Sequence, residues 1–528
     1  MNHFVRLFHR LDQTSKTREK LEALVEFFSS AGDSDKVYAL AYFTGRAGKR
    51  HVASGMLRAW AAEWASIPDW LFEESYHVVG DLAETIASLK TPSQDKGTSN
   101  GDISAWAELL NSLSSLPVAE KKEQVLRIWE QLSREELLVF NKLITGGFRI
   151  GVSDQMVVKG LAMAAGLDPV LVQHRIMGNW KPGELSFAQL FSDDQGESDA
   201  SRPYPFFLAH SLEEAFFSES PEQWQAEWKW DGIRCQIIRR GEQVWLWSRG
   251  EELISDKFPE LQTAACQLKD GTVLDGELIL KKGEEILPFS LLQTRITRKK
   301  ISKKLLEDAP AHFIAYDILE FEGRDVRLNP LAGRRHLLEQ MEENWSQIPF
   351  SLSRKVEFSS WEELKEKKNE ARSQMAEGLM LKNLSSPYRS GRKKGDWWKW
   401  KLDPMCIDGV LLYARKGHGR RADMYTDYTL AVWDDDRLVP FAAAYSGLSD
   451  EEIKAVDAFV KKNTREKFGP VRTVHPQLVF EVGFEGIQAS SRHKSGIALR
   501  FPRILRWRKD KMPEEADTLE ALKAFLNK

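Results

Sequence analysis

The sequence predicts a multidomain protein with an all-α region, a central α+β region and a small β-barrel at the C-terminal end. Its length of 528 residues suits three or four domains at about 150 residues each. The hydrophobic pattern has a helical period before residue 203 and changes to short β-type runs after it. Beyond residue 404 these runs become closely spaced, which is typical of a small barrel.

Residues 1–200 are predicted to be helical almost throughout. The helical spacing i, i+3, i+4, i+7 is clear at Phe4, Leu7, Phe8 and Leu11. Segments 91–102 and 192–203 are polar and rich in helix breakers, so both are interpreted as linkers. The first is expected to be a loop inside the helical region, because neither flank looks complete alone.

The region from 201 to 403 combines runs rich in Val, Ile, Trp and Phe with helix-like stretches. The expected strands are 243–249, 272–280 and 312–321, and the expected helices are 331–343 and 361–376. This alternation predicts a mixed α+β domain. Between 404 and 528 one helix-like segment, 450–462, interrupts the expected strands.

Composition excludes several classes of protein. Hydrophobic residues make up 42% and charged residues 29%, which rules out a fully disordered or collagen-like chain. No apolar run approaches the roughly 18–20 residues of a membrane span, and the N-terminus does not resemble a secretory signal. The three cysteines, Cys235, Cys266 and Cys406, form no CxxC pair, so neither a four-cysteine zinc site nor a disulfide framework is expected. We therefore expect a cytoplasmic protein with no membrane association.

Positive charge is concentrated in two segments. The net charge is only −3, but eleven lysines and arginines between 381 and 421 face three aspartates. The segment 500–511 has six basic residues and one aspartate. Clustered basic charge suggests a surface for a polyanion, although charge alone favours a solvated charged face.

The peptide from Glu227 to Arg234, EWKWDGIR, carries the most chemical information. Lys229 lies between two tryptophans and is expected just after a short strand. An amine is nucleophilic only when it is deprotonated, and burial against indole rings or nearby cations lowers the pKa of a lysine. Asp231 and Gly232 are expected to form a tight turn, and Arg234 could meet a phosphate. Because most lysines are solvated charges, this peptide alone is a modest signal.

Further peptides strengthen the interpretation. Asp275-Gly276-Glu277 places acids inside an apolar run, where a carboxylate is costly without a partner. The stretch from Glu377 to Lys382 puts a second acid and a second lysine around another apolar run. In Trp398-Lys399-Trp400-Lys401, strand period 2 would turn both lysines to one side and both tryptophans to the other. Separate carboxylates with several basic residues suit metal-assisted phosphoryl or nucleotidyl transfer.

The ordered series of these peptides resembles the covalent nucleotidyltransferase superfamily, and most specifically the ATP-dependent DNA ligases. The matching peptides, in chain order, are EWKWDGIR, SRGEE, DGEL, AYDIL, EGLMLK, WKWKLD and LRFPRILRWRKDK. The resemblance implies that Lys229 is the catalytic residue, which becomes adenylylated by ATP. The implied cofactor-binding residues are Glu227, Arg234, Arg249, Glu277, Tyr316, Lys399, Lys401, Arg500 and Arg503. It further implies Mg²⁺, with Mn²⁺ as an alternative, at Glu277 and Glu377.

The resemblance also covers the flanking regions. TGGFRIGVS (145–153) is similar to the phosphate-contacting loop of a helical DNA-binding domain, and 479–503 to the end of an OB-fold domain. The implied domains are an all-α DNA-binding domain (1–200), an α+β nucleotidyltransferase or adenylation domain (201–403) and a C-terminal OB-fold β-barrel (404–528). The implied DNA contacts are Arg149, Arg249, Arg392 and Arg420.

The implied partner is nicked duplex DNA, bound by a monomer without sequence preference, and the resemblance does not choose among DNA replication, repair and recombination.

Rival functions share only part of this pattern. An NAD-dependent ligase shares KxDG but usually carries a four-cysteine zinc finger. An RNA ligase or an mRNA-capping guanylyltransferase is not expected to carry the helical region with 145–153. A DNA-binding scaffold with an inactive transferase domain is disfavoured because Lys229, Glu277 and Glu377 are all present.

Overall fold

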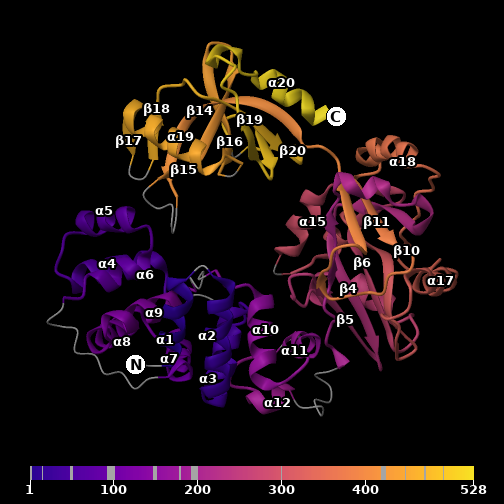
Figure 1. Ribbon diagram of the computed structural model, residues 1–528, viewed down its shortest axis with the longest axis horizontal. Coiled ribbons are helices and arrows are strands. Elements are labelled where there is room, and N and C mark those ends of the chain that lie inside the picture. Colours follow the sequence, from indigo (N-terminus) through magenta and orange to yellow (C-terminus); the bar gives the residue numbers. More distant parts are fainter. Residues whose placement is uncertain are drawn as a thin grey trace. The chain divides into compact units, whose positions relative to one another are not determined.

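The computed structural model (Figure 1) describes most of the chain. The described residues are 3–14, 16–47, 51–91, 102–146, 151–177, 180–191, 200–298, 300–417, 424–445, 447–468, 471–491 and 493–527. They group into two compact units. One unit comprises 1–15, 48–151 and 403–528, and the other comprises 16–47 and 152–402.

The N-terminal region is helical, as predicted. Its helices are α1 (His3–Gln13), α2 (Thr17–Ser30), α3 (Asp33–Phe43), α4 (Ser54–Trp64), α5 (Asp69–Val79), α6 (Leu82–Ser88), α7 (Ile103–Leu113), α8 (Val118–Gln131), α9 (Arg134–Thr145), α10 (Asp154–Ala165), α11 (Pro169–Ile176) and α12 (Phe187–Phe191). The apolar stripe expected for the first helix is fully buried in α1. Most of the two expected linkers, 92–101 and 192–199, lies outside the described residues.

Side chains satisfy backbone groups at the ends of these helices. Ser133 and Glu136 form a capping box at the start of α9. The buried Lys90 ammonium donates hydrogen bonds to the carbonyl oxygens of Trp129 and Glu130 at 3.0 and 3.1 Å. A cation at the end of α8 offsets the partial negative charge of the last carbonyls, and these hydrogen bonds reduce the cost of burying the lysine.

Two sheets form the α+β region. The larger, seven-stranded sheet has β10 (Phe350–Leu352), β8 (Ala311–Phe321), β6 (Thr272–Lys282), β4 (Ile233–Arg240) and β5 (Gln243–Ser248) in that order, with β7 (Glu285–Ile286) on β6 and β9 (Arg324–Asp325) on β8. The smaller sheet has the order β2 (His210–Ser211), β13 (Trp397–Lys401), β11 (Ala376–Asn383) and β3 (Trp224–Trp230). A short parallel pair joins β1 (Phe207–Leu208) to β12 (Gly391–Arg392).

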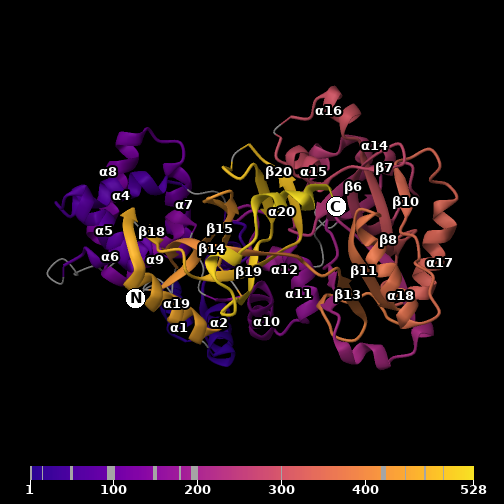
Figure 2. The same ribbon diagram turned by 90° about the horizontal axis from the view of Figure 1, so that it is seen from above.

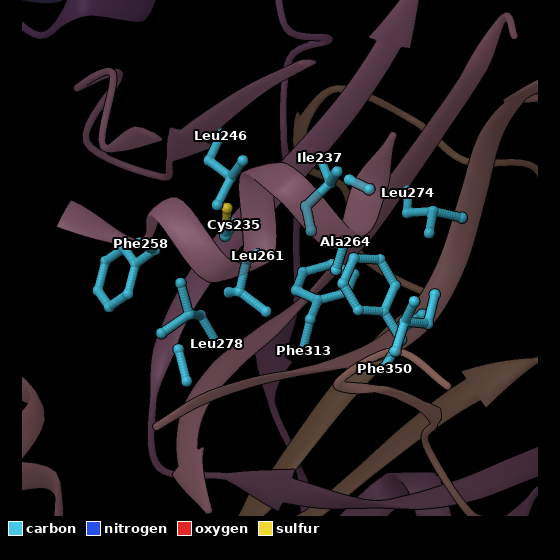
Figure 3. Packing of buried hydrophobic residues seen from close by; sticks show 14 of the residues in the cluster. Cys235, Ile237, Leu246, Phe258, Leu261, Ala264, Leu274, Leu278, Phe313 and Phe350 are labelled. Carbon is cyan, nitrogen blue, oxygen red and sulfur yellow. The ribbon is translucent and has the colours of Figure 1, made fainter. Parts of the chain in front are cut away.

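Three apolar clusters hold these sheets in place. On one face of the larger sheet, the cluster in Figure 3 packs against α14 (Pro259–Ala265), α15 (Phe289–Ile296) and α17 (Leu331–Glu342). The same helices can be followed in Figure 2. A second cluster is shared by both sheets and includes Ile238, Val273 and Trp397. The third covers the other face of the smaller sheet, where Leu379 and Trp398 pack with Trp361 of α18 (Trp361–Lys368). Each of the two sheets is therefore held by apolar packing, and the charged residues described below come from strands of both sheets.

The expected elements of this region are largely confirmed. The runs 243–249, 272–280 and 312–321 correspond to β5, β6 and β8, and 331–343 to α17. The expected helix 361–376 is shorter, because α18 ends at Lys368 and a 3₁₀ turn, Asn369–Arg372, leads towards β11. A lone helix α16 (Lys303–Asp308) completes the region.

The C-terminal region is rich in strands. Its larger sheet has the order β16 (Arg437–Ala444), β15 (Tyr425–Asp434), β14 (Met405–Lys416), β18 (Val471–Val474) and β17 (Thr464–Phe468). The strand β19 (Val479–Phe484) joins β14 to β22 (Arg503–Trp507), and β20 (Gly486–Ala489) pairs with β21 (Ile497–Arg500). The helices are α19 (Asp450–Asn463), close to the expected 450–462, and α20 (Leu519–Lys523). Within the described residues these pairings do not close into a barrel, so the barrel stays a prediction. None of the described helices is long and apolar enough to cross a membrane.

Candidate active site

Lys229 lies near the end of β3, within the strand rather than after it. Residues 231 and 232 form the expected tight turn, and the chain then enters β4, which belongs to the other sheet. A Cβ atom at Gly232 would lie 2.4 Å from the carbonyl oxygen of Leu278 and 2.8 Å from Cγ of Glu277. Only glycine fits this turn against β6, and the turn places Lys229 and Arg234 on two different sheets.

Strand alternation sorts the side chains of the smaller sheet. The register pairs Met380 of β11 with Glu227 of β3 and with Lys399 of β13, so these residues share one face. The opposite face contributes tryptophans to the apolar cluster with Trp361, among them Trp398 and Trp400. The predicted separation of lysines from tryptophans in β13 is therefore confirmed.

A β-bulge turns Glu377 towards Lys229. Ala376 pairs with Trp230 and Leu379 with Trp228, so Glu377 and Gly378 together lie opposite Lys229. Strict alternation would instead place Glu377 on the apolar side with Leu379. The bulge depends on Gly378, which has φ +140° and whose added Cβ would lie 2.2 Å from the carbonyl oxygen of Trp400.

The bulge brings a carboxylate to two ammonium groups. Lys229 Nζ donates a hydrogen bond to Oε2 of Glu377. Lys401 Nζ lies 3.4 Å from the same oxygen. All three side chains are partly shielded from solvent, with exposed fractions of 22% for Lys229 and 18% for Glu377. Their attraction is therefore stronger than it would be between fully exposed groups.

On the larger sheet, Asp275 has the partner that a buried acid needs. Arg234 donates to both of its carboxylate oxygens, at 3.2 and 2.7 Å, and to the carbonyl oxygen of Phe207 at 2.7 Å. The Tyr388 hydroxyl donates to Oδ2 of Asp275 at 2.7 Å. Burial lowers the pKa of the Arg234 guanidinium, but Asp275, together with Tyr316 and Tyr388, raises it above its ordinary value. These hydrogen bonds fix the position of the Arg234 side chain.

Glu277 is the most strongly perturbed carboxyl of the site. The pKa of Glu277 is raised to about 8, mainly by burial and to a smaller extent by the charges of Asp275 and Glu377, while Lys229 and Arg234 oppose the shift. The charges of Lys229 and Glu377 therefore both act on the carboxyl group of Glu277.

Basic residues converge on Lys399. Burial lowers the pKa of Lys399, and the positive charges of Arg392, Lys401, Lys229 and Arg249 lower it further. Arg249 follows β5, and its backbone N–H donates to the carbonyl oxygen of Arg234 at 3.0 Å. Several mutually repelling cations in one place form a site for a polyanion such as a nucleotide phosphate chain.

Glu227 belongs to a buried polar group. Its Oε1 accepts hydrogen bonds from Gln225 at 2.6 Å and from Lys382 at 3.0 Å, and both Glu227 and Lys382 are 1% exposed. The Lys382 ammonium also lies 4.4 Å from the ring centre of Tyr316. Our site prediction omitted Lys382, Gln225 and Tyr388. The signal that could have found the first two is a polar side chain at an inward position of a largely apolar strand.

The remaining predicted residues lie elsewhere. Arg500 and Arg503 belong to β21 and β22 of the C-terminal region, where Arg503 lies 3.4 Å from Glu485. Arg149 and Arg420 lie outside the described residues. Within the described part of the chain, no three acidic, histidine or cysteine side chains are grouped to hold a metal ion.

Comparisons with known proteins agree with this geometry. The ATP dependent DNA ligase domain matches residues 207–401, the DNA ligase N terminus matches 1–162, and the ATP dependent DNA ligase C terminal region matches 421–511. A probable DNA ligase of Koribacter versatilis is 30% identical, over 96% of this chain and 93% of that protein. DNA ligase 1 of Korarchaeum cryptofilum is 28% identical, over 100% and 98%. The solved structure Pmar-Lig_PreS3 has a similar fold, with a TM-score of 0.64 and 16% identity over 96% of this chain and 99% of that one.

A partly buried lysine beside two carboxylates and several cations is an arrangement typical of the nucleotidyltransferases. With the matches along its length, the chain belongs to the ATP-dependent DNA ligases, enzymes that seal nicks in DNA through an adenylate intermediate.

Replacing Gly378 with alanine tests the bulge. Because the new Cβ would overlap the backbone of β13, we expect Gly378→Ala to cost about 1–3 kcal/mol of stability. Loss of the bulge would also turn Glu377 away from Lys229 and slow self-adenylylation about ten-fold or more. Gly395→Ala is the matched control, since Gly395 has φ +106° but open space around it. Equal losses of adenylylation in both variants would contradict the role of the bulge.

The pKa of Glu277 predicts a pH-dependent stability. A glutamate in the unfolded chain loses its proton near pH 4.5, whereas folded Glu277 keeps it to about pH 8. The native state is therefore destabilised as the pH rises from 4.5 to 8, by about 1–3 kcal/mol. Glu277→Gln carries no titrating proton and should not show this loss. Urea denaturation at pH 5, 7 and 9 without metal or nucleotide, followed by tryptophan fluorescence, measures the difference. Parallel pH profiles for both proteins would contradict it.

Proposed function

We propose that the chain seals nicks by three successive phosphoryl-type transfers, with Lys229 as the residue that carries AMP. The supporting observation is the position of Lys229. Its amine reaches the carboxylate of Glu377 and lies among the cations around Lys399. A nucleophile at the meeting point of acids and phosphate-binding cations suits attack on a nucleotide α-phosphate.

In the first step, the neutral amine of Lys229 attacks the α-phosphorus of ATP. A nitrogen–phosphorus bond forms, the bond to the bridging oxygen breaks, and pyrophosphate leaves with the electron pair. Lys399 and Lys401 hold the α-phosphate, and the basic segment with Arg500 and Arg503 orients the leaving group. Next, AMP passes to the 5′-phosphate at the nick, and the 3′-hydroxyl then displaces AMP. Fixed positive charge around the phosphate oxygens is the main source of rate in such transfers.

The adenosine end of ATP is assigned to the buried polar group of the site. Tyr316 stacks on the base, Glu227 contacts its polar edge, and Glu277 lies at the ribose. Arg249 contacts the nucleotide and then the DNA phosphate. Arg234 is already engaged by Asp275, and it lines the nucleotide pocket as a fixed positive charge.

The donor set fits Mg²⁺ bound together with the nucleotide. Mg²⁺ usually keeps several waters and is held by one or two carboxylates plus substrate phosphates. Glu277 and Glu377 supply two neighbouring carboxylates, and the described residues offer no third. When bound, Mg²⁺, or Mn²⁺ in its place, would neutralise charge on the phosphates.

For DNA we propose the domain division 1–200, 201–403 and 404–528, with an OB fold in the last part. The protein binds nicked duplex DNA through phosphates, independent of sequence, because its basic residues carry charge rather than a base-reading pattern. The DNA contacts are Arg149, Arg249, Arg392 and Arg420. A monomer suffices, since one chain supplies the whole lysine site. DNA binding and the successive steps require the second and third domains to move relative to each other, and we propose Asp403-Pro404 as the hinge, next to the boundary between the two compact units.

Lys229→Arg tests the assignment. A guanidinium is not a nucleophile at neutral pH, so sealing of an ordinary nick with ATP should fall by about 10³-fold or more. Sealing of a nick that already carries 5′-AMP should persist, because that step does not use the amine. Lys282→Arg, at the exposed end of β6, is the matched control. If the Lys229→Arg variant sealed ordinary nicks at the normal rate, the assignment of Lys229 as the AMP-carrying residue would be wrong.

A further inference from the structure

Asp408 of β14 is a buried carboxylate in the C-terminal region that the mechanism above does not use. It is 5% exposed. Its backbone N–H donates to Oδ2 of Asp517 at 2.7 Å, and its carbonyl oxygen accepts from the N–H of Asp517 at 3.1 Å. These two bonds fix the backbone around the carboxylate.

One oxygen of this carboxylate holds two cations of the basic segment. Arg508 Nη1 and Lys511 Nζ each donate to Oδ2 of Asp408 at 2.7 Å. Arg508 also bonds Asp510, at 2.8 Å from Nη2. The other oxygen of Asp408, Oδ1, is buried and accepts no hydrogen bond from any described residue. A carboxylate buried for stability alone would be expected to have hydrogen bonds to both oxygens. Here only Oδ2 is bonded, and both of its partners are cations, so the carboxylate fixes the positions of the cations while Oδ1 stays without a hydrogen bond from the described residues.

The held pair differs from its neighbours along the segment. Arg506 pairs with Glu481 across the sheet surface at 2.6 Å, and its side chain is 61% exposed. Arg508 and Lys511 are more shielded, at 14% and 29% exposed. Exposed ion pairs fix side chains weakly, whereas a shared buried acceptor restricts both long side chains at once.

We infer that Asp408 is a positioning residue for the first step, holding Arg508 and Lys511 in the arrangement that receives the pyrophosphate end of ATP. This inference rests on the proposed function of the basic segment. In that step the Lys229 nitrogen bonds to the α-phosphorus, the bond to the bridging oxygen breaks, pyrophosphate leaves with its electron pair, and the nitrogen gives up one proton to solvent water. Cations already in place need no reordering when this charge develops. Because the sealing step involves no pyrophosphate, it does not depend on Asp408.

Asp408→Asn in the full-length protein tests the inference. The amide keeps the size of the side chain but loses its charge, so Lys511 and Nη1 of Arg508 lose the carboxylate that fixes them, while Arg508 keeps its bond to Asp510. We expect self-adenylylation to slow about ten-fold or more. In the reverse reaction, in which pyrophosphate removes AMP from the enzyme, the pyrophosphate concentration for half-maximal rate should rise about five-fold or more. Sealing of a pre-adenylated nick should stay within about two-fold of the unmodified protein.

Two further variants separate positioning from folding. Asp457→Asn removes another buried aspartate of the same region, which bonds the N–H of Tyr425 and the Lys461 ammonium, and it should leave the pyrophosphate dependence unchanged. Asp408→Glu keeps the charge and should recover part of the lost rate.

Equal slowing of all steps by Asp408→Asn, or an unchanged pyrophosphate dependence, would overturn the inference. Faster adenylylation would also overturn it, because Asp408 would then keep Arg508 and Lys511 away from the phosphates. If the unmodified protein itself formed no AMP adduct, the proposed function would fail instead.

Discussion

The chain changes sheets within two residues, at Asp231 and Gly232, and the charged groups of the catalytic region depend on that constraint. Lys229 lies near the end of a strand of one sheet and Arg234 near the start of a strand of the other, so the two side chains come from different sheets. The apolar cluster shared by both sheets fixes their separation, and the clusters on their outer faces keep each sheet from turning. Apolar packing thus sets the geometry in which a lysine, two glutamates and several cations can face one another.

The charged side chains between the two sheets are compensated mainly by ion pairs with one another rather than by solvent. Arg234 is bound to Asp275, Lys382 to Glu227, and Lys229 to Glu377. Against these pairs, the pKa shifts of Glu277 and Lys399 indicate an acid and a base whose charged forms are both disfavoured. A metal nucleotide brings a cation to the acids and phosphates to the bases. Under the proposed function, the same ligand would offset both unfavourable charges.

The strand alternation and the sequence motifs made much of the active-site arrangement predictable from the sequence. Alternation separated Lys399 and Lys401 from the tryptophans, and an acid inside an apolar strand correctly implied a partner for Asp275. The orientation of Glu377 could not be predicted, because it follows from a bulge that appears only when β11 pairs with β3. The partners of Lys382 and Tyr388 were equally hidden, since they lie 155 and 113 residues away along the chain. Alternation is local, whereas register and long-range polar pairing arise only in the folded chain.

Intact mass and peptide mapping after incubation with Mg²⁺ and, separately, ATP, GTP or NAD test the central claim most directly. The protein should first be shown to be folded and free of bound AMP. The account predicts one AMP adduct, from ATP alone, on the peptide containing Lys229. A GMP adduct would indicate capping chemistry, and an AMP adduct from NAD would indicate the other class of DNA ligase. An adduct on a different lysine, or none from any nucleotide, would contradict the account.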